Sequence, residues 1–484
     1  MTFVSEFEPK ALWGHFDKML TIPRGSKEEE EIREYVLSLA QQHGLDYQVD
    51  ATGNLVVRKP GTAGKEDAPV TILQSHLDMV NDKDSDVEHD FHKDPIRPVR
   101  EGEYLTADRT TLGADNGIGV AAMLAIMEAD DLAHGPLELL FTIDEETGLT
   151  GASGLDPSML RGRRLLNLDS EEEGAVTVGC AGAADSLLSL RLQHLPSPQN
   201  VSVHRVRLHG LKGGHSGLDI HLQRGNAIQL LARMIHAVAR GTPGFQAGVE
   251  GGSKRNVIPR EASATVVIPE EQSSGFLEQV GEQFELVKEE YKAVDPGMAL
   301  SIEEVPVPAE VWTTDSTWNV LRLLVALPHG VVAMSNDISG LVETSTNLAV
   351  VRTEGHELNV ILNSRSSVAS ALAWSRRKIR AIGFLAGARV EEPDGYPGWK
   401  PNLDSPLLQV VKSVHARITG REPHVEALHA GLECGLIGEM VPGMDMISFG
   451  PQIESPHSPN ERVKIDSVGR FYDLLTAILE ELAA

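Results

Sequence analysis

VTILQSHLDMV (residues 70–80) decides the fold of this chain of 484 residues. Its apolar start is typical of a buried strand, and its end carries His76 and Asp78, which can bind a metal ion or orient its ligands. Three other apolar runs are followed by side chains of the same kind: residues 137–143 by Glu145 and Glu146, residues 165–168 by Asp169, and residues 446–449, after a short loop, by His457. In open α/β sheets, ligands bind outside the carboxyl ends of the strands. The recurrence therefore predicts an α/β fold with a metal site at that edge.

The composition argues against several classes of protein. Apolar residues make up 41% of the chain and charged residues 23%, values typical of globular proteins in water. The net charge of −27 argues against nucleic acid or an anionic membrane as a partner. No apolar run approaches the roughly 18 residues that span a bilayer, and the acidic N-terminus does not have the pattern of a secretory signal. Because Cys180 and Cys434 are too few for a disulfide framework, we expect a cytoplasmic protein with reduced thiols.

The chain is too long for one ordinary core, and its pattern changes along the sequence. Helical and strand patterns alternate up to residue 183, as in βα domains, whereas antiparallel strand patterns with intervening helices follow from residue 184. The last candidate ligand, His457, lies beyond that segment. We therefore predict an α/β catalytic domain of residues 1–183 and 387–484, with a mixed, mostly parallel sheet flanked by helices. Residues 184–386 would form an inserted α+β lid that binds substrate.

A candidate metal centre combines the strand-end side chains with Asp115, which lies in LGADNG (112–117), where a buried helix of residues 116–129 is expected. The set contains two imidazoles and three carboxylates: His76, Asp115, Glu146, Asp169 and His457. One tetrahedral zinc cannot use them all, but two divalent ions about 3.5–4 Å apart with a bridging carboxylate can. Nitrogen and oxygen ligands without a thiolate favour two Zn²⁺ per chain, with Mn²⁺ or Co²⁺ as substitutes. Each residue alone would more often be a cap or a loop residue, so the prediction rests on the whole set.

The doublet Glu145–Glu146 is the most informative local feature of this set. At the end of a strand, one carboxylate can bind a metal ion while the other turns to the cavity and acts as a general base. Asp78 is expected to accept the second imidazole N–H of His76. Paired acids elsewhere, including the neighbouring run of Glu171, Glu172 and Glu173, are expected to be solvated surface.

Several spaced motifs together resemble one family of enzymes. They are QSHLDMV (74–80), GADNGIGVA (113–121), DEETGLTGA (144–152), LNLDSEEEG (166–174), GGHSGLDI (213–220), YPGWKPN (396–402), HAGLECG (429–435) and SPHSPNE (455–461). The chain resembles the di-zinc aminoacylase/carboxypeptidase G superfamily of metallopeptidases from end to end. Within that superfamily it is most similar to the bacterial aminoacyl-histidine dipeptidases.

The resemblance implies a role for each residue of the centre. Asp115 would bridge the two zinc ions, with His76 and Asp169 on one ion and Glu146 and His457 on the other. Glu145 would be the base that takes a proton from the water bridging the ions and returns it to the leaving amine. The family also implies a cis peptide between Asp115 and Asn116.

The resemblance implies substrate-binding residues in the lid as well. His215 in GGHSG would stabilise the tetrahedral oxyanion, and Asn256 and Arg365 would hold the terminal carboxylate of a small peptide substrate. Relatives are often homodimers, and some supply the equivalent of His215 from the partner's lid. Whether His215 acts in its own chain or in a partner's chain stays open at this point.

Three functions remain after this comparison. The first is hydrolysis of unblocked dipeptides, including Xaa-His. The second is an acylase or carboxypeptidase that acts on N-blocked amino acids, and the implied ligand Asp169 favours the first function over it. The third is a non-catalytic peptide- or metal-binding relative, and the intact Glu145 argues against it.

Overall fold

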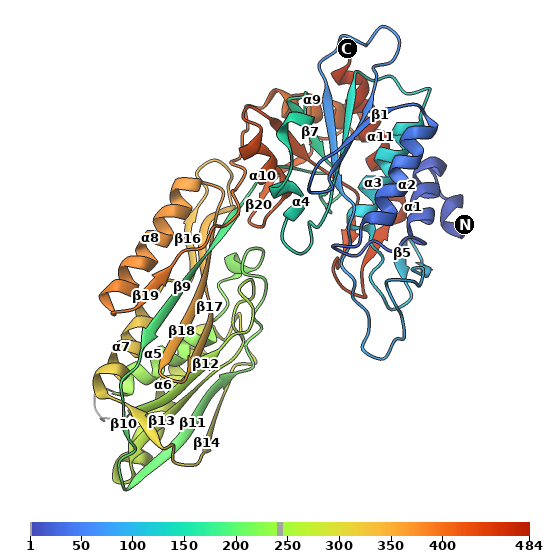
Figure 1. The fold of residues 1–484 in the computed structure, drawn as a ribbon. Helices are drawn as coiled ribbons and strands as arrows, with labels where there is room; N and C mark the ends of the chain where they lie inside the picture. Colours follow the sequence, from blue (N-terminus) through green and yellow to red (C-terminus); the bar gives the residue numbers. More distant parts are fainter. Residues whose placement is uncertain (1, 240–244) are drawn as a thin grey trace. The chain divides into compact units, whose positions relative to one another are not determined.

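The computed structural model describes residues 2–239 and 245–484, which form two compact units. The first unit comprises Met1–Gly179, Trp399–Ala427 and Leu432–Ala484, and the second comprises Cys180–Gly398 and Leu428–Gly431 (Figure 1). The second unit thus extends beyond the expected boundary at residue 386. Among the described residues, no helix combines the length and the apolar character needed to cross a membrane.

The first unit is built on a mixed eight-stranded sheet. Its strands, in spatial order, are β1 (Asp46–Val49), β2 (Leu55–Lys59), β6 (Leu137–Thr142), β3 (Thr71–His76), β7 (Arg164–Asn167), β21 (Asp445–Ser448), β8 (Ala175–Cys180) and β20 (His424–Leu428). The four central strands, from β6 to β21, are parallel to one another, whereas β1 pairs with β2, β2 with β6, and β8 with β21 in antiparallel fashion. Every residue of β3 and β6 is buried, as expected for parallel strands covered on both faces. This confirms the predicted fold class.

Helices flank this sheet. The longer ones are α1 (Lys10–Met19), α2 (Glu30–Gln42), α3 (Ala114–Glu128), α9 (Pro406–Thr419) and α11 (Ile465–Leu482), and the shorter ones are η1 (Phe3–Glu6), α4 (Thr150–Ser153), η2 (Pro157–Met159) and α10 (Glu433–Met440). The expected helix at residues 116–129 is α3, and α1 and α2 lie beside it (Figure 1). Apart from Glu128, every residue of α3 is buried, because it is apolar all round.

A small four-stranded sheet completes the first unit. It consists of β22 (Ile453–Glu454), β23 (Arg462–Lys464), β5 (Tyr104–Ala107) and β4 (Pro98–Glu101). Residues 81–112 show no periodic pattern in the sequence, yet they contain the β4–β5 hairpin. The loop of residues 455–461 between β22 and β23 carries His457, whose backbone has a φ of 58°.

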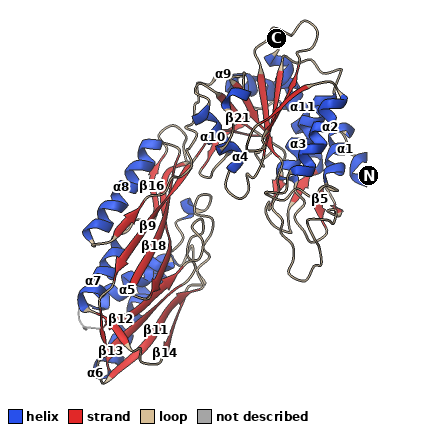
Figure 2. Cartoon of the chain, viewed as in Figure 1, coloured by secondary structure: helices blue, strands red, loops and turns tan. Residues whose placement is uncertain are grey.

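The second unit is a nine-stranded sheet with helices on one face (Figure 2). Its strands are β14 (Ala299–Glu304), β11 (Val201–His209), β13 (Ala262–Pro269), β12 (Phe245–Gly251), β17 (Val342–Glu354), β18 (Glu357–Ser366), β9 (Gly182–Arg191) and β19 (Arg389–Glu391), with β16 (Gly330–Met334) beside β17. The helices are η3 (Ile220–Leu222), α5 (Ala227–Ala239), α6 (Glu270–Tyr291), α7 (Thr314–Ala326) and α8 (Ala369–Leu385), and β10 (His194–Pro196) pairs with β15 (Glu310–Trp312). One continuous apolar core joins the four long helices to the sheet.

Candidate metal centre

Five side chains that lie far apart in the sequence converge in the first unit. His76 Nε2 lies 3.2 Å from Asp115 Oδ1 and 3.2 Å from Asp169 Oδ1. His457 Nε2 lies 3.0 Å from Asp115 Oδ2 and 3.0 Å from Glu146 Oε2. The two oxygens of Asp115 therefore face two different imidazoles. In each of these two groups of three, one ligand atom from each residue lies within 4.8 Å of the others.

The strand ends and one helix start explain this convergence. His76 is the last residue of β3, Asp169 follows β7 by two residues, and Glu146 follows β6 after a short loop. Asp115 lies in the first turn of α3, and the peptide bond between Asp115 and Asn116 is cis, as the family resemblance implies. Parallel strands place their carboxyl ends at the same edge of a sheet, so the predicted edge is where the cluster lies.

The chemistry of this cluster fits divalent cations. Glu146 Oε1 is buried and has no hydrogen-bond partner among the described residues, which leaves a carboxylate oxygen free for an ion. Burial raises the pKa of Asp169 to about 6, against the opposing influence of His76. Burial, helped by Asp115 and Asp169, also raises the pKa of Glu171 to about 9. Such crowded carboxylates are stabilised in their charged form when cations lie between them.

Asp78 contacts both His76 and the loop that carries the two glutamates. Its Oδ1 lies 3.3 Å from His76 Nδ1, the arrangement expected from the sequence. The same carboxylate accepts hydrogen bonds from the backbone N–H groups of Glu145, at 3.0 Å, and Glu146, at 3.2 Å, and from the hydroxyl of Ser26 at 2.8 Å. Asp78 thus orients the imidazole and also holds the loop that carries both glutamates.

Glu145 belongs to the same edge of the sheet. One of its oxygens lies within 4.8 Å of ligand atoms of both His76 and Glu146. Desolvation raises its pKa well above the usual range of a glutamate, and the neighbouring carboxylates Asp169, Glu146 and Glu433 add to the shift. A carboxylate with an elevated pKa has the proton affinity that a general base needs.

Four charged residues around this cluster were not predicted from the sequence. Glu171, expected on the solvated surface, is half-buried beside the acids of the centre. Arg24 is buried and donates to the carbonyl oxygens of Leu77, Asp78 and Gly113. Glu433 and Glu461 are buried carboxylates that lie within motifs quoted above, HAGLECG and SPHSPNE. Membership of those motifs was the available signal for the two glutamates, whereas Arg24 lies in no such pattern.

The predicted substrate residues all lie in the second unit. His215 and Asn256 are neighbours, because the N–H of Ser216 donates to the carbonyl oxygen of Asn256 at 2.9 Å. The Nδ1 of His215 accepts from the backbone N–H of Leu218 at 3.0 Å, which fixes the orientation of its ring. Arg365 is buried on β18 and donates to the hydroxyl of Tyr396 at 3.2 Å, while its Nε has no partner among the described residues. An orphaned buried donor is suited to an anionic ligand.

The chain is similar to known proteins over its full length. It is 40% identical over 484 residues to the cytosol non-specific dipeptidase of Escherichia coli (strain K12), with 100% of each chain covered. It is 42% identical to the aminoacylhistidine dipeptidase of Vibrio alginolyticus, whose crystal structure superposes with a TM-score of 0.91 and covers 99% of this chain and 98% of that one. The aminopeptidase PepT of Bacillus cereus shares the fold at 17% identity, with a TM-score of 0.57 over 99% of this chain and 100% of the other.

A family model matches the chain as well. The model of peptidase family M20/M25/M40 matches residues 72–481, a range that includes every residue of the candidate metal centre. The resemblance noted in the sequence is thereby confirmed. The chain belongs to peptidase family M20/M25/M40.

Proposed function

We propose that this protein is a dinuclear zinc dipeptidase that hydrolyses unblocked dipeptides, including Xaa-His. Its full-length relatives are named as dipeptidases, which supports the substrate class. The observation that carries the proposal is the position of Asp115, with one oxygen near His76 and the other near His457, because two ions sharing this carboxylate need such a geometry. The name of the Escherichia coli relative supports a cytoplasmic location.

In this proposal, His76 and Asp169 would hold one ion, Glu146 and His457 the other, and Asp115 both. When bound, the ions would polarise the peptide carbonyl and make water acidic enough to lose a proton near neutral pH. Glu145 takes the proton from the attacking water and delivers it to the leaving amine nitrogen. Asp78 keeps the His76 ring and the glutamate loop in place throughout.

The second unit would act as the lid. We assign the oxyanion of the tetrahedral intermediate to His215 and the free carboxylate of the dipeptide to Asn256 and Arg365. The support for Arg365 is its buried Nε, which has no partner within the described ranges of the chain, since guanidinium groups bind carboxylates through two parallel hydrogen bonds. The alternative is a metal-dependent acylase or carboxypeptidase that acts on N-blocked amino acids. Asp169 as the fifth ligand argues against it.

The test compares an unblocked Xaa-His dipeptide with its N-acetyl analogue, each with zinc and after chelation. We expect zinc-dependent cleavage of the free dipeptide only. Glu145→Gln should lower kcat by roughly 10²–10⁴-fold, the usual contribution of a general base. Glu172→Gln, in an exposed acid close in sequence to the centre, is the matched control and should keep full activity. Cleavage of the acetylated compound alone would assign the protein to the acylases, and full activity of Glu145→Gln would remove the proposed base.

A further inference from the structure

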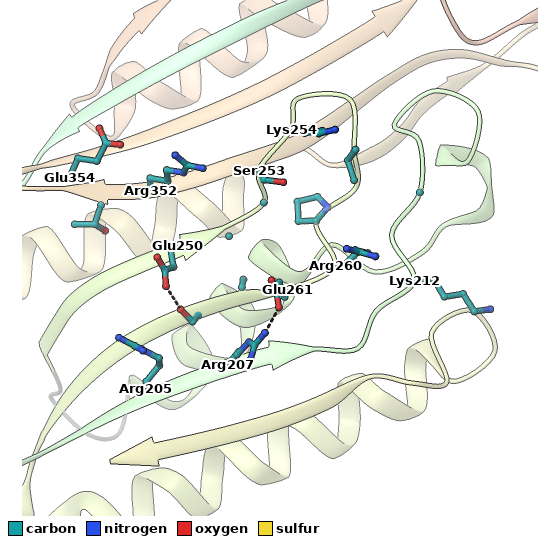
Figure 3. Close-up of a pocket in the computed structure, with 18 of the residues that line it drawn as sticks. Arg205, Arg207, Lys212, Glu250, Ser253, Lys254, Arg260, Glu261, Arg352 and Glu354 are labelled. Atoms are coloured by element: carbon teal, nitrogen blue, oxygen red, sulfur yellow. Dashed lines mark hydrogen bonds and ion pairs between the residues drawn. The ribbon is translucent and has the colours of Figure 1, made fainter. Parts of the chain in front are cut away.

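The second unit contains a basic cleft that none of the proposed catalytic residues lines (Figure 3). Its volume is about 1070 Å³, and six of its nineteen lining residues are lysine or arginine, against 43 of 484 in the whole chain. The six are Arg205, Arg207, Lys212, Lys254, Arg260 and Arg352. Four glutamates also line it, so the cleft is a local excess of positive charge in a protein whose net charge is −27.

The cleft lies on one face of the nine-stranded sheet. The strand register aligns Arg207 on β11 with Ser263 on β13, Ser263 with Glu250 on β12, and Glu250 with Arg352 on β17. These four side chains therefore form one row across four strands, and neighbouring strands lie about 4.8 Å apart, so the two arginines of the row are roughly 14 Å apart. None of the four belongs to the apolar core that packs the long helices against the sheet.

Most of these cations have no anionic partner in the part of the chain that the structure describes. Arg207 forms an ion pair with Glu261, and Glu250 accepts a hydrogen bond from the hydroxyl of Ser263 at 3.1 Å (Figure 3). Among the described residues, no carboxylate lies within ion-pair distance of the other five basic residues of the cleft. Arg205, Arg260 and Arg352 are exposed to solvent, so a ligand in the cleft can reach them. Like charges gathered in one hollow repel each other, and an anion between them removes that repulsion.

We propose that this cleft binds a small, extended polyanion that carries phosphate or carboxylate groups at both ends. The volume lies just above the usual range for small-molecule sites, about 300–1,000 Å³, and the spacing of the arginines along the row exceeds what one phosphate can bridge. Guanidinium groups recognise both kinds of anion through paired hydrogen bonds. The site would be separate from the carboxylate subsite proposed at Asn256 and Arg365, because neither residue lines the cleft. The proposal does not depend on the proposed hydrolysis.

Calorimetric titration of the zinc-loaded protein with tripolyphosphate and, separately, with citrate tests this site. We expect saturable binding of at least one probe that weakens as NaCl is raised from 25 to 250 mM. Arg205→Ser and Arg352→Ser should each weaken binding roughly tenfold, the size expected for one lost charge-assisted contact, and Arg352→Glu should weaken it further. Both sites of substitution, Arg205 and Arg352, are exposed side chains, and equal melting temperatures would show that the fold is intact.

The control variant is Arg191→Ser, in an exposed arginine of β9 that does not line the cleft. Heat from probe binding at the metal centre would be the same in the control and in the cleft variants, so the difference between them reports the cleft alone. Stronger binding of tripolyphosphate would identify the ligand as a phosphate compound, and stronger binding of citrate as a carboxylate. Equal affinities of Arg191→Ser and Arg352→Ser, or no saturable binding, would overturn the proposal.

Discussion

Glu433 shows how burial beside the centre changes the pKa of a single residue. It is buried, and one oxygen accepts hydrogen bonds from Gln74 Nε2 at 2.6 Å and from the Thr142 hydroxyl at 2.7 Å, while the other has no partner among the described residues. These two partners lie on β3 and β6, the strands that lead to His76 and Glu146. Burial raises the pKa of Glu433 to about 7, and Asp169 and Asp78 add to the effect.

A stability change with pH follows from Glu433. The pKa of a glutamate in the unfolded chain is about 4.3, so the unfolded state loses this proton first as the pH rises. Its contribution to stability is therefore full below that pH and is lost as the pH rises through about 7. In chelated protein, Glu433→Gln should abolish this loss, so the melting temperature of the variant relative to wild type should rise between pH 4.5 and 7.5.

Exposed Glu422 provides the matched control, because Glu422→Gln should leave the difference constant with pH. A constant difference for Glu433→Gln as well would contradict the elevated pKa. Calorimetric melting at intervals of half a pH unit makes the comparison.

Single residues of the centre could be predicted from the sequence only where a motif marks them. His76, Asp115, Glu146, Asp169 and His457 stand at strand ends, a helix start or a turn, and the structure brings all five together. Arg24 could not be found this way, because its partners are carbonyl oxygens more than fifty residues away in the sequence. Glu171 was misassigned because a run of acids is usually solvated, and only the fold shows which of the three faces inward.

At the scale of elements, the start of α3 depends on Glu461. This buried carboxylate accepts hydrogen bonds from four successive backbone N–H groups, those of Leu112, Gly113, Ala114 and Asp115, at distances of 2.7 to 3.2 Å. The first N–H groups of a helix have no partner within the helix, so Glu461 satisfies them from the segment that follows His457. Glu461 thereby connects the start of α3, which carries Asp115, to the segment that carries His457.

Glu461→Ala should therefore destabilise the protein more than most substitutions. Each buried donor left without a partner costs about 1–3 kcal/mol, so the free energy of unfolding should fall by at least about 3 kcal/mol. Glu461→Gln, which keeps one acceptor oxygen, should lose less. Urea unfolding measures both, and Glu103→Ala in an exposed glutamate should change stability little. Equal stability of Glu461→Ala and wild type would contradict this role.

Elements whose apolar residues recur at a regular spacing could be predicted from the sequence, whereas elements without such a spacing could not. The helix predicted at residues 116–129 is α3, which begins two residues earlier and ends one residue earlier than predicted. The β4–β5 hairpin was missed, because residues 81–112 are rich in Asp, Pro and Arg and carry no alternation. Its strands are held by pairing with β23, which is more than 350 residues away in the sequence.

At the scale of the whole molecule, the chain forms two units with separate interiors. The second begins at Cys180, four residues before the change of pattern expected at residue 184, and it also includes Leu428–Gly431. No sequence pattern marks that short return, because it is defined by contacts such as the hydrogen bond from the Ala181 N–H to the carbonyl oxygen of Leu428 at 3.0 Å. The proposed metal ligands all belong to the first unit.

Chelation should accordingly affect the two units differently. An ion at one hundred times its Kd stabilises the folded state by about 2.7 kcal/mol, which corresponds to a melting shift of roughly 5–10 °C for a unit of this size. Differential scanning calorimetry should show one transition that moves down by at least this much on chelation and another that stays. Movement of both transitions, or of neither, would contradict a metal centre confined to the first unit.

The most direct test of the account is a count of zinc ions per chain by equilibrium dialysis and elemental analysis. Wild type and Glu145→Gln should each bind two ions, because Glu145 is proposed as a base and not as a ligand. Asp115→Ala should bind fewer than two, since the carboxylate that faces both imidazoles is gone. One ion in wild type, or loss of an ion in Glu145→Gln, would contradict the shared two-ion centre.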